Sequence, residues 1–186
     1  MVRLFIEPIA TEEALRKGAT AEDKAFVEAF SSAHRRREVL AWRSIVRREL
    51  GSDCAIGYDE WGAPVVGNSD THISVSHCRD LVAVVISDTP CAVDIEERGR
   101  NFEGVSARYM TEQERSLSTD TDWSAMVWCA KEALYKYYRK GGVEIREDIK
   151  ILGYDADSES LQAAIFDTRL EVKVERQGEY IVATID

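Results

Sequence analysis

The 186-residue sequence lacks any apolar run approaching the ~20 residues of a membrane-spanning helix. Its opening segment, MVRLFIE, meets charge too early for the apolar core of a secretory signal and instead predicts a first strand. The four cysteines show no CxxC spacing and three lie in apolar surroundings, which favours buried free thiols over zinc ligands or disulfides. With 45% hydrophobic residues, the chain is expected to be a soluble, cytoplasmic, globular protein without membrane association.

Basic residues are in the minority, because 24 lysines and arginines face 34 aspartates and glutamates, a formal net charge of −10. This balance argues against general nucleic-acid binding. Residues 31–50 are the exception, with six arginines against two glutamates, a net charge of +4. A helix predicted over 33–50 places Arg36 and Arg43 along the edge of its apolar stripe. Their guanidinium groups suit a phosphate ligand, and the alternative is a solvated basic face.

The segment 128–136, WCAKEALYK, sits in a strongly helical run and places an acid between two lysines. On a helix, Glu132 and Lys136 lie one turn apart on the side opposite the apolar residues, whereas Lys131 is turned about 100° from Glu132. One face is therefore available for chemistry. The alternative is a solvent-exposed ion pair that adds only a little helix stability.

A second acidic group lies upstream in the predicted strand 91–97, CAVDIEE, where Asp94 and Glu96 point to the same face. Two neighbouring carboxylates repel each other unless a cation lies between them. With Glu132 they make three oxygen ligands, a set that suits Mg²⁺ or Mn²⁺. The alternative is an edge strand with a polar outer face.

Two further local patterns carry candidate residues. The predicted strand beginning at His72 ends at Ser76 and His77, whose side chains can donate to a phosphate but cannot form a nucleophile and base by adjacency alone. A capped strand end is the alternative. Thr111 to Glu114, TEQE, reads as a capping box, which gives Glu114 a sufficient structural reason to be there.

Four of these segments occur in the order found in one protein family: ISVSH (73–77), AVDIE (92–96), TEQE (111–114) and WCAKEALYK (128–136). The sequence thus resembles the 4'-phosphopantetheinyl transferases, specifically the surfactin-type branch with two similar halves in one chain, from about Ser32 to Lys140. The resemblance implies an α+β fold with two similar α/β halves related by pseudo-twofold symmetry. A long helix followed by strands occurs twice in the sequence, which fits an N-terminal half 1–89 and a C-terminal half 90–186, acting as a monomer.

The reaction implied by the resemblance moves 4'-phosphopantetheine from coenzyme A to a serine of an acyl or peptidyl carrier protein. In the family's pattern, Asp94, Glu96 and Glu132 would hold the divalent ion, and Glu132 or a water on the ion would accept the serine proton. Lys136 and Lys131 would stabilise charge on the phosphate, although Lys131 could instead brace the cleft. Ser76 and His77 would bind the 3'-phosphate of coenzyme A. Arg36 and Arg43 would be further coenzyme A ligands. The family also places an acid near the metal at the position of Glu114.

One departure keeps a rival function open. The family commonly has Gly-Lys-Pro after a hairpin turn, whereas this chain has Gly62, Ala63 and Pro64, so a lysine expected near the 3'-phosphate is absent. The rival is a non-catalytic homologue that binds carrier protein or coenzyme A. A metal-dependent nuclease fits less well, because it would want its acid and lysine on a strand beside a basic groove.

Overall fold

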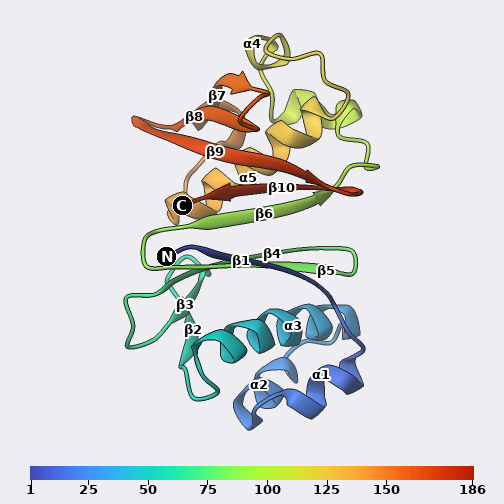
Figure 1. Ribbon diagram of the computed structural model, residues 1–186, viewed down its shortest axis with the longest axis vertical. Helices are drawn as coiled ribbons and strands as arrows, with labels where there is room; N and C mark the ends of the chain where they lie inside the picture. Colours follow the sequence, from blue (N-terminus) through green and yellow to red (C-terminus); the bar gives the residue numbers. More distant parts are fainter. The chain divides into compact units, whose positions relative to one another are not determined.

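The computed structural model describes residues 1–186, which form two units, Met1–Thr89 and Pro90–Asp186 (Figure 1). Each unit has a long helix packed on an antiparallel sheet. The mixed α and β composition expected from the sequence is confirmed. None of the helices combines the length and the apolar character that crossing a membrane requires.

The sheet of the first unit has the order β1–β5–β4, with bounds Arg3–Pro8 (β1), Leu81–Ser87 (β5) and His72–Cys78 (β4). The central strand β5 is buried almost throughout, as its continuous apolar run predicts. The strand β4 ends at Cys78, one residue beyond His77, so Ser76 and His77 lie near the end of the strand and are still paired with β5. A separate hairpin consists of β2 (Ile56–Tyr58) and β3 (Pro64–Val66).

Helix α3 (Ala33–Leu50) has the predicted limits. The Ser32 side chain caps its first turn by accepting from the backbone of Arg35, and Gly51 ends it with a φ of 105° that favours glycine. Its apolar stripe, including Val39 and Val46, packs against the sheet in the core of this unit. Figure 1 shows α3 lying along one face of the β1–β5–β4 sheet.

Two short helices precede α3: α1 (Glu12–Gly18) and α2 (Ala21–Val27). Thr20 caps α2, because its hydroxyl accepts from the backbone N–H of Asp23. Helix α1 was not predicted from the sequence. None of its residues is buried. The segment therefore lacks the apolar stripe at helical spacing by which a helix is predicted from sequence.

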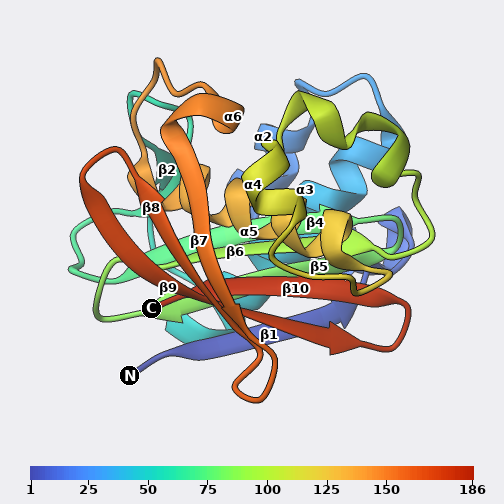
Figure 2. The same cartoon turned by 90° about the horizontal axis from the view of Figure 1, so that it is seen from above.

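The second unit holds a five-stranded sheet of order β6–β10–β9–β8–β7 (Figure 2). The strand bounds are Ala92–Glu97 (β6), Tyr180–Ile185 (β10), Thr168–Gln177 (β9), Ser160–Ile165 (β8) and Ile149–Asp155 (β7). Helix α5 (Trp123–Tyr138) packs on this sheet with its apolar face in the core, as predicted. Three short elements complete the unit: the 3₁₀ helix Glu103–Arg108, α4 (Glu112–Arg115) and α6 (Ile145–Asp148).

The glycine pair Gly141 and Gly142 in the sequence predicts that this helix runs up to it, whereas α5 ends earlier. Arg139 takes the left-handed conformation one residue after the helix ends at Tyr138, with φ 51° and ψ 38°. Its N–H bonds back to the carbonyl of Tyr135, so the orphan carbonyls of the last turn are partly satisfied there. The glycine pair therefore follows the helix terminus instead of forming it.

Candidate functional site

The strand β6 and the helix α5 bring the predicted acidic residues and a lysine together within the second unit. Lys136 Nζ lies 2.7 Å from Asp94 Oδ1 and 3.1 Å from the carbonyl of Val93. The Asp94 side chain is 6% exposed and the Lys136 side chain 27%. A lysine ammonium thus neutralises the most buried of the three predicted acids and stands at the edge of solvent.

Glu96, the other strand carboxylate, has two donors from either side of the site. Trp128 Nε1 donates to Glu96 Oε1 at 2.8 Å, and the Arg100 guanidinium pairs with Oε2. Burial and the charge of Asp94 raise the pKa of Glu96, and the bonds from Trp128 and Arg100 only partly offset this. The charge of Asp94 therefore acts on Glu96, as their shared strand face predicts.

Glu132 completes the acidic group. Burial, followed by the charges of Asp94 and Glu96, raises its pKa to about 7, although Lys136 acts in the opposite direction. A carboxyl group with such a pKa is close to half ionised at neutral pH, which suits a group that takes up a proton.

The donor chemistry of the three acids fits a hard divalent cation, because all of the ligand atoms are carboxylate oxygens and their mutual repulsion is what a cation would relieve. The structure contains no group of three acidic, histidine or cysteine side chains arranged as a preformed metal site. Lys136 and Arg100 instead pair with Asp94 and Glu96. Metal binding therefore stays a prediction. For a metal ion to bind, the Lys136 and Arg100 side chains would have to share Asp94 and Glu96 with it or move away from them.

The raised pKa of Glu132 has a stability consequence that needs no metal. The ordinary value is 4.5 and the folded value about 7, so between these pH values the folded state binds more protons than the unfolded state. Stability should therefore fall as the pH rises through this window. We expect Glu132→Gln to melt several degrees above the wild type at about pH 8 with a chelator present, and close to it at about pH 4. Melting curves that differ equally at both pH values would contradict the assigned environment.

Lys131, the neighbour of Glu132 in the sequence, points elsewhere. Its side chain is fully buried, and its Nζ lies 2.8 Å from Glu114 Oε1 and 2.7 Å from the carbonyl of Tyr109. The capping box of Glu114 with Thr111 is confirmed. Of the two roles weighed for Lys131, phosphate contact and bracing, its position supports bracing.

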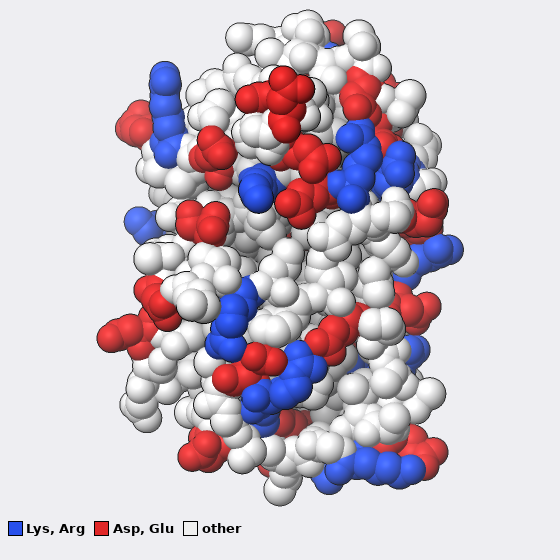
Figure 3. All heavy atoms as spheres, in the orientation of Figure 1, with Lys and Arg blue, Asp and Glu red and all other residues white.

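The arginines of α3 are not a free basic surface. Each of the six forms an ion pair with an acid, several of them from α1, α2 and β1: Arg35–Glu38, Arg36–Glu12, Arg37–Asp80, Arg43–Asp23, Arg47–Glu22 and Arg48–Glu7. On the face visible in Figure 3, basic and acidic side chains lie interspersed. The net charge of +4 read from the sequence is therefore balanced by residues that the fold brings in from elsewhere.

Two of these arginines, Arg36 and Arg43, are predicted ligands of coenzyme A. Arg36 is 22% exposed and donates to Glu12 and to two carbonyls before the helix. Arg43 is 1% exposed, paired with Asp23 and Glu22, and lies over the ring of Phe26 at 4.8 Å. Direct contact of Arg43 with a ligand stays a prediction, and its burial disfavours it.

His77 has a different arginine beside it. Arg35 Nη1 lies 2.8 Å from His77 Nε2, and His77 Nδ1 lies 2.9 Å from Glu38 Oε1. Ser76 is adjacent in the strand and buried. Sequence reasoning did not single out Arg35 because its meeting with β4 depends on how α3 packs on the sheet.

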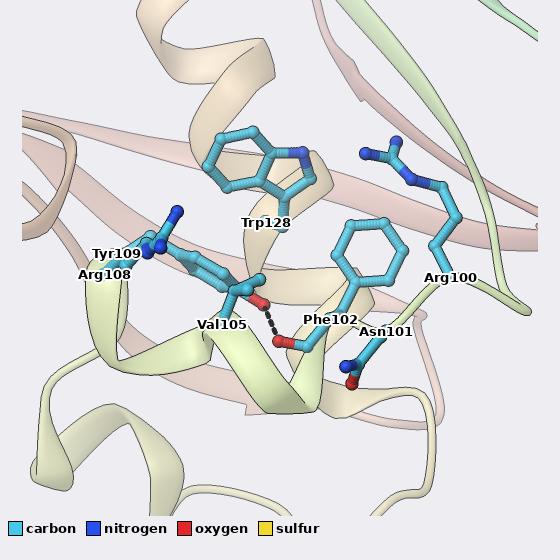
Figure 4. Close-up of a pocket in the computed structure, with 7 residues that line it drawn as sticks. All are labelled: Arg100, Asn101, Phe102, Val105, Arg108, Tyr109 and Trp128. Atoms are coloured by element: carbon cyan, nitrogen blue, oxygen red, sulfur yellow. Dashed lines mark hydrogen bonds between the residues drawn. The ribbon is translucent and has the colours of Figure 1, made fainter.

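A pocket of about 370 Å³ opens beside Glu96, and it was not predicted from the sequence. Seven residues line it: Arg100, Asn101, Phe102, Val105, Arg108, Tyr109 and Trp128. Figure 4 shows the aromatic rings gathered around it, with the two guanidinium groups on opposite sides in that view. The rings of Tyr109 and Trp128 meet edge to face at 5.0 Å. The available sequence signal was a few apolar residues in the polar stretch 97–115, among them Phe102, Val105 and Tyr109.

Comparison with known proteins gives one result for the second unit. The family model described as "4'-phosphopantetheinyl transferase superfamily" matches residues 90–185. The matched stretch contains the three acids, Lys131 and Lys136, and the whole lining of the pocket. No curated protein matches the chain.

Proposed function

The chain belongs to the 4'-phosphopantetheinyl transferase superfamily, and on that premise we propose that it transfers 4'-phosphopantetheine from coenzyme A to a serine of an acyl or peptidyl carrier protein, releasing 3',5'-adenosine diphosphate. The observation that supports this best is the group of three mutually repelling acids with a lysine among them, inside the matched residues. Transfer of a phosphoryl group depends mainly on positioning and charge stabilisation, which this group can supply.

Asp94, Glu96 and Glu132 would hold Mg²⁺ or Mn²⁺, which when bound would offset the negative charge of the pyrophosphate under attack. Glu132 would also accept the proton of the carrier serine, because burial and the two neighbouring acids make its carboxylate more basic than usual in the metal-free protein. Lys136, at the solvent edge of Asp94, supplies a positive charge for the phosphate that is transferred. Lys131 stays buried and acts by holding the surrounding structure.

The pocket beside Glu96 receives the pantetheine arm in this proposal. Its walls are mainly aromatic and apolar, and the Arg100 and Arg108 side chains at its sides can donate to amide or phosphate oxygens. Trp128 connects the pocket to the acids, because one side of its ring lines the cavity while its N–H holds Glu96. An extended chain in the pocket would thus lead to the reacting phosphate.

The 3'-phosphate of coenzyme A is assigned to residues of the first unit. We propose that Ser76, His77 and Arg35 contact the 3'-phosphate, with Arg36 as a further ligand at the start of α3. Arg43 contributes by fixing α2 against α3. With a long helix packed on a sheet in each unit, the chain fits the two-halved surfactin-type form, a cytoplasmic monomer whose halves 1–89 and 90–186 are related by pseudo-twofold symmetry.

A non-catalytic homologue that only binds carrier protein or coenzyme A is the second candidate. Two observations favour it: Ala63 replaces the lysine that the family commonly has, and the acids already hold Lys136 and Arg100 as partners. It would keep the pocket while losing transfer.

Intact-mass measurement of an apo carrier protein separates the two candidates. The protein is incubated with coenzyme A, Mg²⁺ and the carrier, with a carrier whose acceptor serine is changed to alanine as the control. We expect the wild-type carrier to gain one phosphopantetheine group and the control to stay unchanged. Binding of coenzyme A without any gain of mass, over a panel of acyl and peptidyl carriers, would contradict the transferase and favour the binding homologue.

A further inference from the structure

We infer that the buried Lys131–Glu114 ion pair is a positioning device that fixes the Tyr109–Trp128 aromatic wall and, through the Trp128 N–H, the carboxylate of Glu96. Neither residue of the pair lines the pocket, and neither is one of the three acids. The consequence for transfer rests on the proposed function, whereas the positioning of Trp128 and Glu96 stands on the contacts alone.

The ion pair joins α5 and α4 to three further parts of the second unit: the backbone at Tyr109, α6 and β7. Lys131 Nζ on α5 donates to the carbonyl of Tyr109 at 2.7 Å and lies 3.4 Å from the carbonyl of Ile145 in α6. Glu114 Oε1 accepts from the backbone of Ile151 in β7 at 2.9 Å, and Oε2 accepts from the backbone of Thr111 at 2.8 Å. Both charged groups are therefore bound to backbone atoms of neighbouring segments.

The path from this junction to Glu96 is short. Lys131 lies one helical turn after Trp128, so the two side chains leave α5 on the same side. Lys131 holds the backbone of Tyr109, and Trp128 packs against its ring at 5.0 Å with an interplanar angle of 62°. Trp128 Nε1 then donates to Glu96 at 2.8 Å.

The phenol of Tyr109 adds a second restraint on the same wall. Its hydroxyl lies 2.9 Å from the carbonyl of Ser124 in α5 and 3.2 Å from the carbonyl of Phe102, the latter bond drawn in Figure 4. Tyr109 is thus fixed at its backbone by Lys131 and at its ring end by α5. A change at Lys131 would leave the hydroxyl bonds in place and shift the ring about them.

Burial makes a purely stabilising role a poor explanation for charged groups here. Lys131 is 0% exposed and Glu114 2%, so both charged groups lie in the interior of the unit. A buried ion pair contributes little stability beyond what apolar residues of similar size would supply. An ammonium group does what no apolar side chain can, because it bonds to a carboxylate and to two carbonyls at once.

The test is the ¹⁵N–¹H spectrum of the four tryptophan indoles in Lys131→Met. Trp42 and Trp61 lie in the first unit and serve as internal references, while Trp123 donates to the carbonyl of Glu114 and reports on the ion pair itself. We expect the Trp123 and Trp128 indole signals to shift, and the Trp42 and Trp61 signals to stay. A shift of Trp123 with an unchanged Trp128 would overturn the inference, because the pair would then only support its immediate surroundings.

Two further variants keep the test decisive. Lys150→Met removes a partly exposed lysine of the same unit and should leave the Trp128 signal unchanged. If Lys131→Met does not fold, the double variant Lys131→Met with Glu114→Gln carries no unpaired buried charge, and the same shift of Trp128 is expected in it. An unshifted Trp128 signal in the folded double variant would equally overturn the inference.

The rate of carrier labelling tests the consequence for transfer independently of the indole spectrum. In a folded variant, we expect the rate of carrier labelling at saturating coenzyme A to fall about tenfold or more, because Glu96 is displaced. A displaced Trp128 with an unaltered rate would refute the consequence for transfer. If the wild type labels no carrier, the proposed function fails, and the spectrum still decides whether the ion pair positions Trp128 and Glu96.

Discussion

Glu132→Gln is expected to slow carrier labelling by about 10³-fold while the protein stays folded. Glutamine keeps the shape of the side chain and removes its charge and its ability to take a proton. Glu132 is the acid whose pKa, about 7, is raised by burial and by both strand carboxylates, so it is the member of the group best placed to act as the base. The initial rate is measured by intact mass of the carrier at saturating coenzyme A and Mg²⁺.

The matched control is Glu112→Gln. Glu112 lies on α4 in the same unit with its side chain 94% exposed, and its substitution should leave the labelling rate within about twofold of the wild type. Near-normal labelling by Glu132→Gln would remove Glu132 from the catalytic group.

Asp23→Asn is expected to destabilise the protein by about 3–5 kcal/mol, because it removes the charge that pairs two buried arginines. Asp23 is 2% exposed, Arg43 1% and Arg47 8%. Both guanidinium groups bond to its carboxylate, and only the half-exposed Glu22 would remain to pair with them. Chemical denaturation measures the loss, with Glu13→Gln on the exposed face of α1 as a control that should change stability by less than about 0.5 kcal/mol.

The ion pair of Arg43 with Asp23 also bears on whether Arg43 is structural or binds coenzyme A. If the role of Arg43 is structural, Arg43→Met should lower the free energy of unfolding and leave the KM for coenzyme A of the folded protein unchanged. A raised KM with unaltered stability would instead support the ligand role predicted from the sequence. A stability loss below about 1 kcal/mol in Asp23→Asn would show that the buried charges are solvated in solution.

Local signals in the sequence were sufficient for most elements of the fold. The limits of α3 follow from Ser32 and Gly51, and the capping box from Thr111 and Glu114. The proximity of Asp94 to Lys136 could also be predicted from the sequence. Side-chain alternation in the strand and the helical period each place a polar face where β6 meets α5.

What the sequence did not reveal depends on contacts between distant segments. The burial of Arg43 requires Asp23 from another helix, and the contact of Arg35 with His77 requires the packing of α3 on β4. The pocket needs the 3₁₀ helix to fold against Trp128. Each of these side chains has an ordinary local explanation as part of a polar surface, so periodicity and spacing alone do not identify its partner.

We expect Asp94, Glu96 and Glu132 to act as one cation-binding centre, which titration calorimetry with Mg²⁺ measures. We expect one Mg²⁺ to bind the wild type and the Glu112→Gln control. The binding heat should be lost in Asp94→Asn and in Glu132→Gln, since each removes one of the charged oxygen ligands from the group. Wild-type binding of Mg²⁺ that persists unchanged in both variants, or no binding in the folded wild type with coenzyme A present, would contradict it.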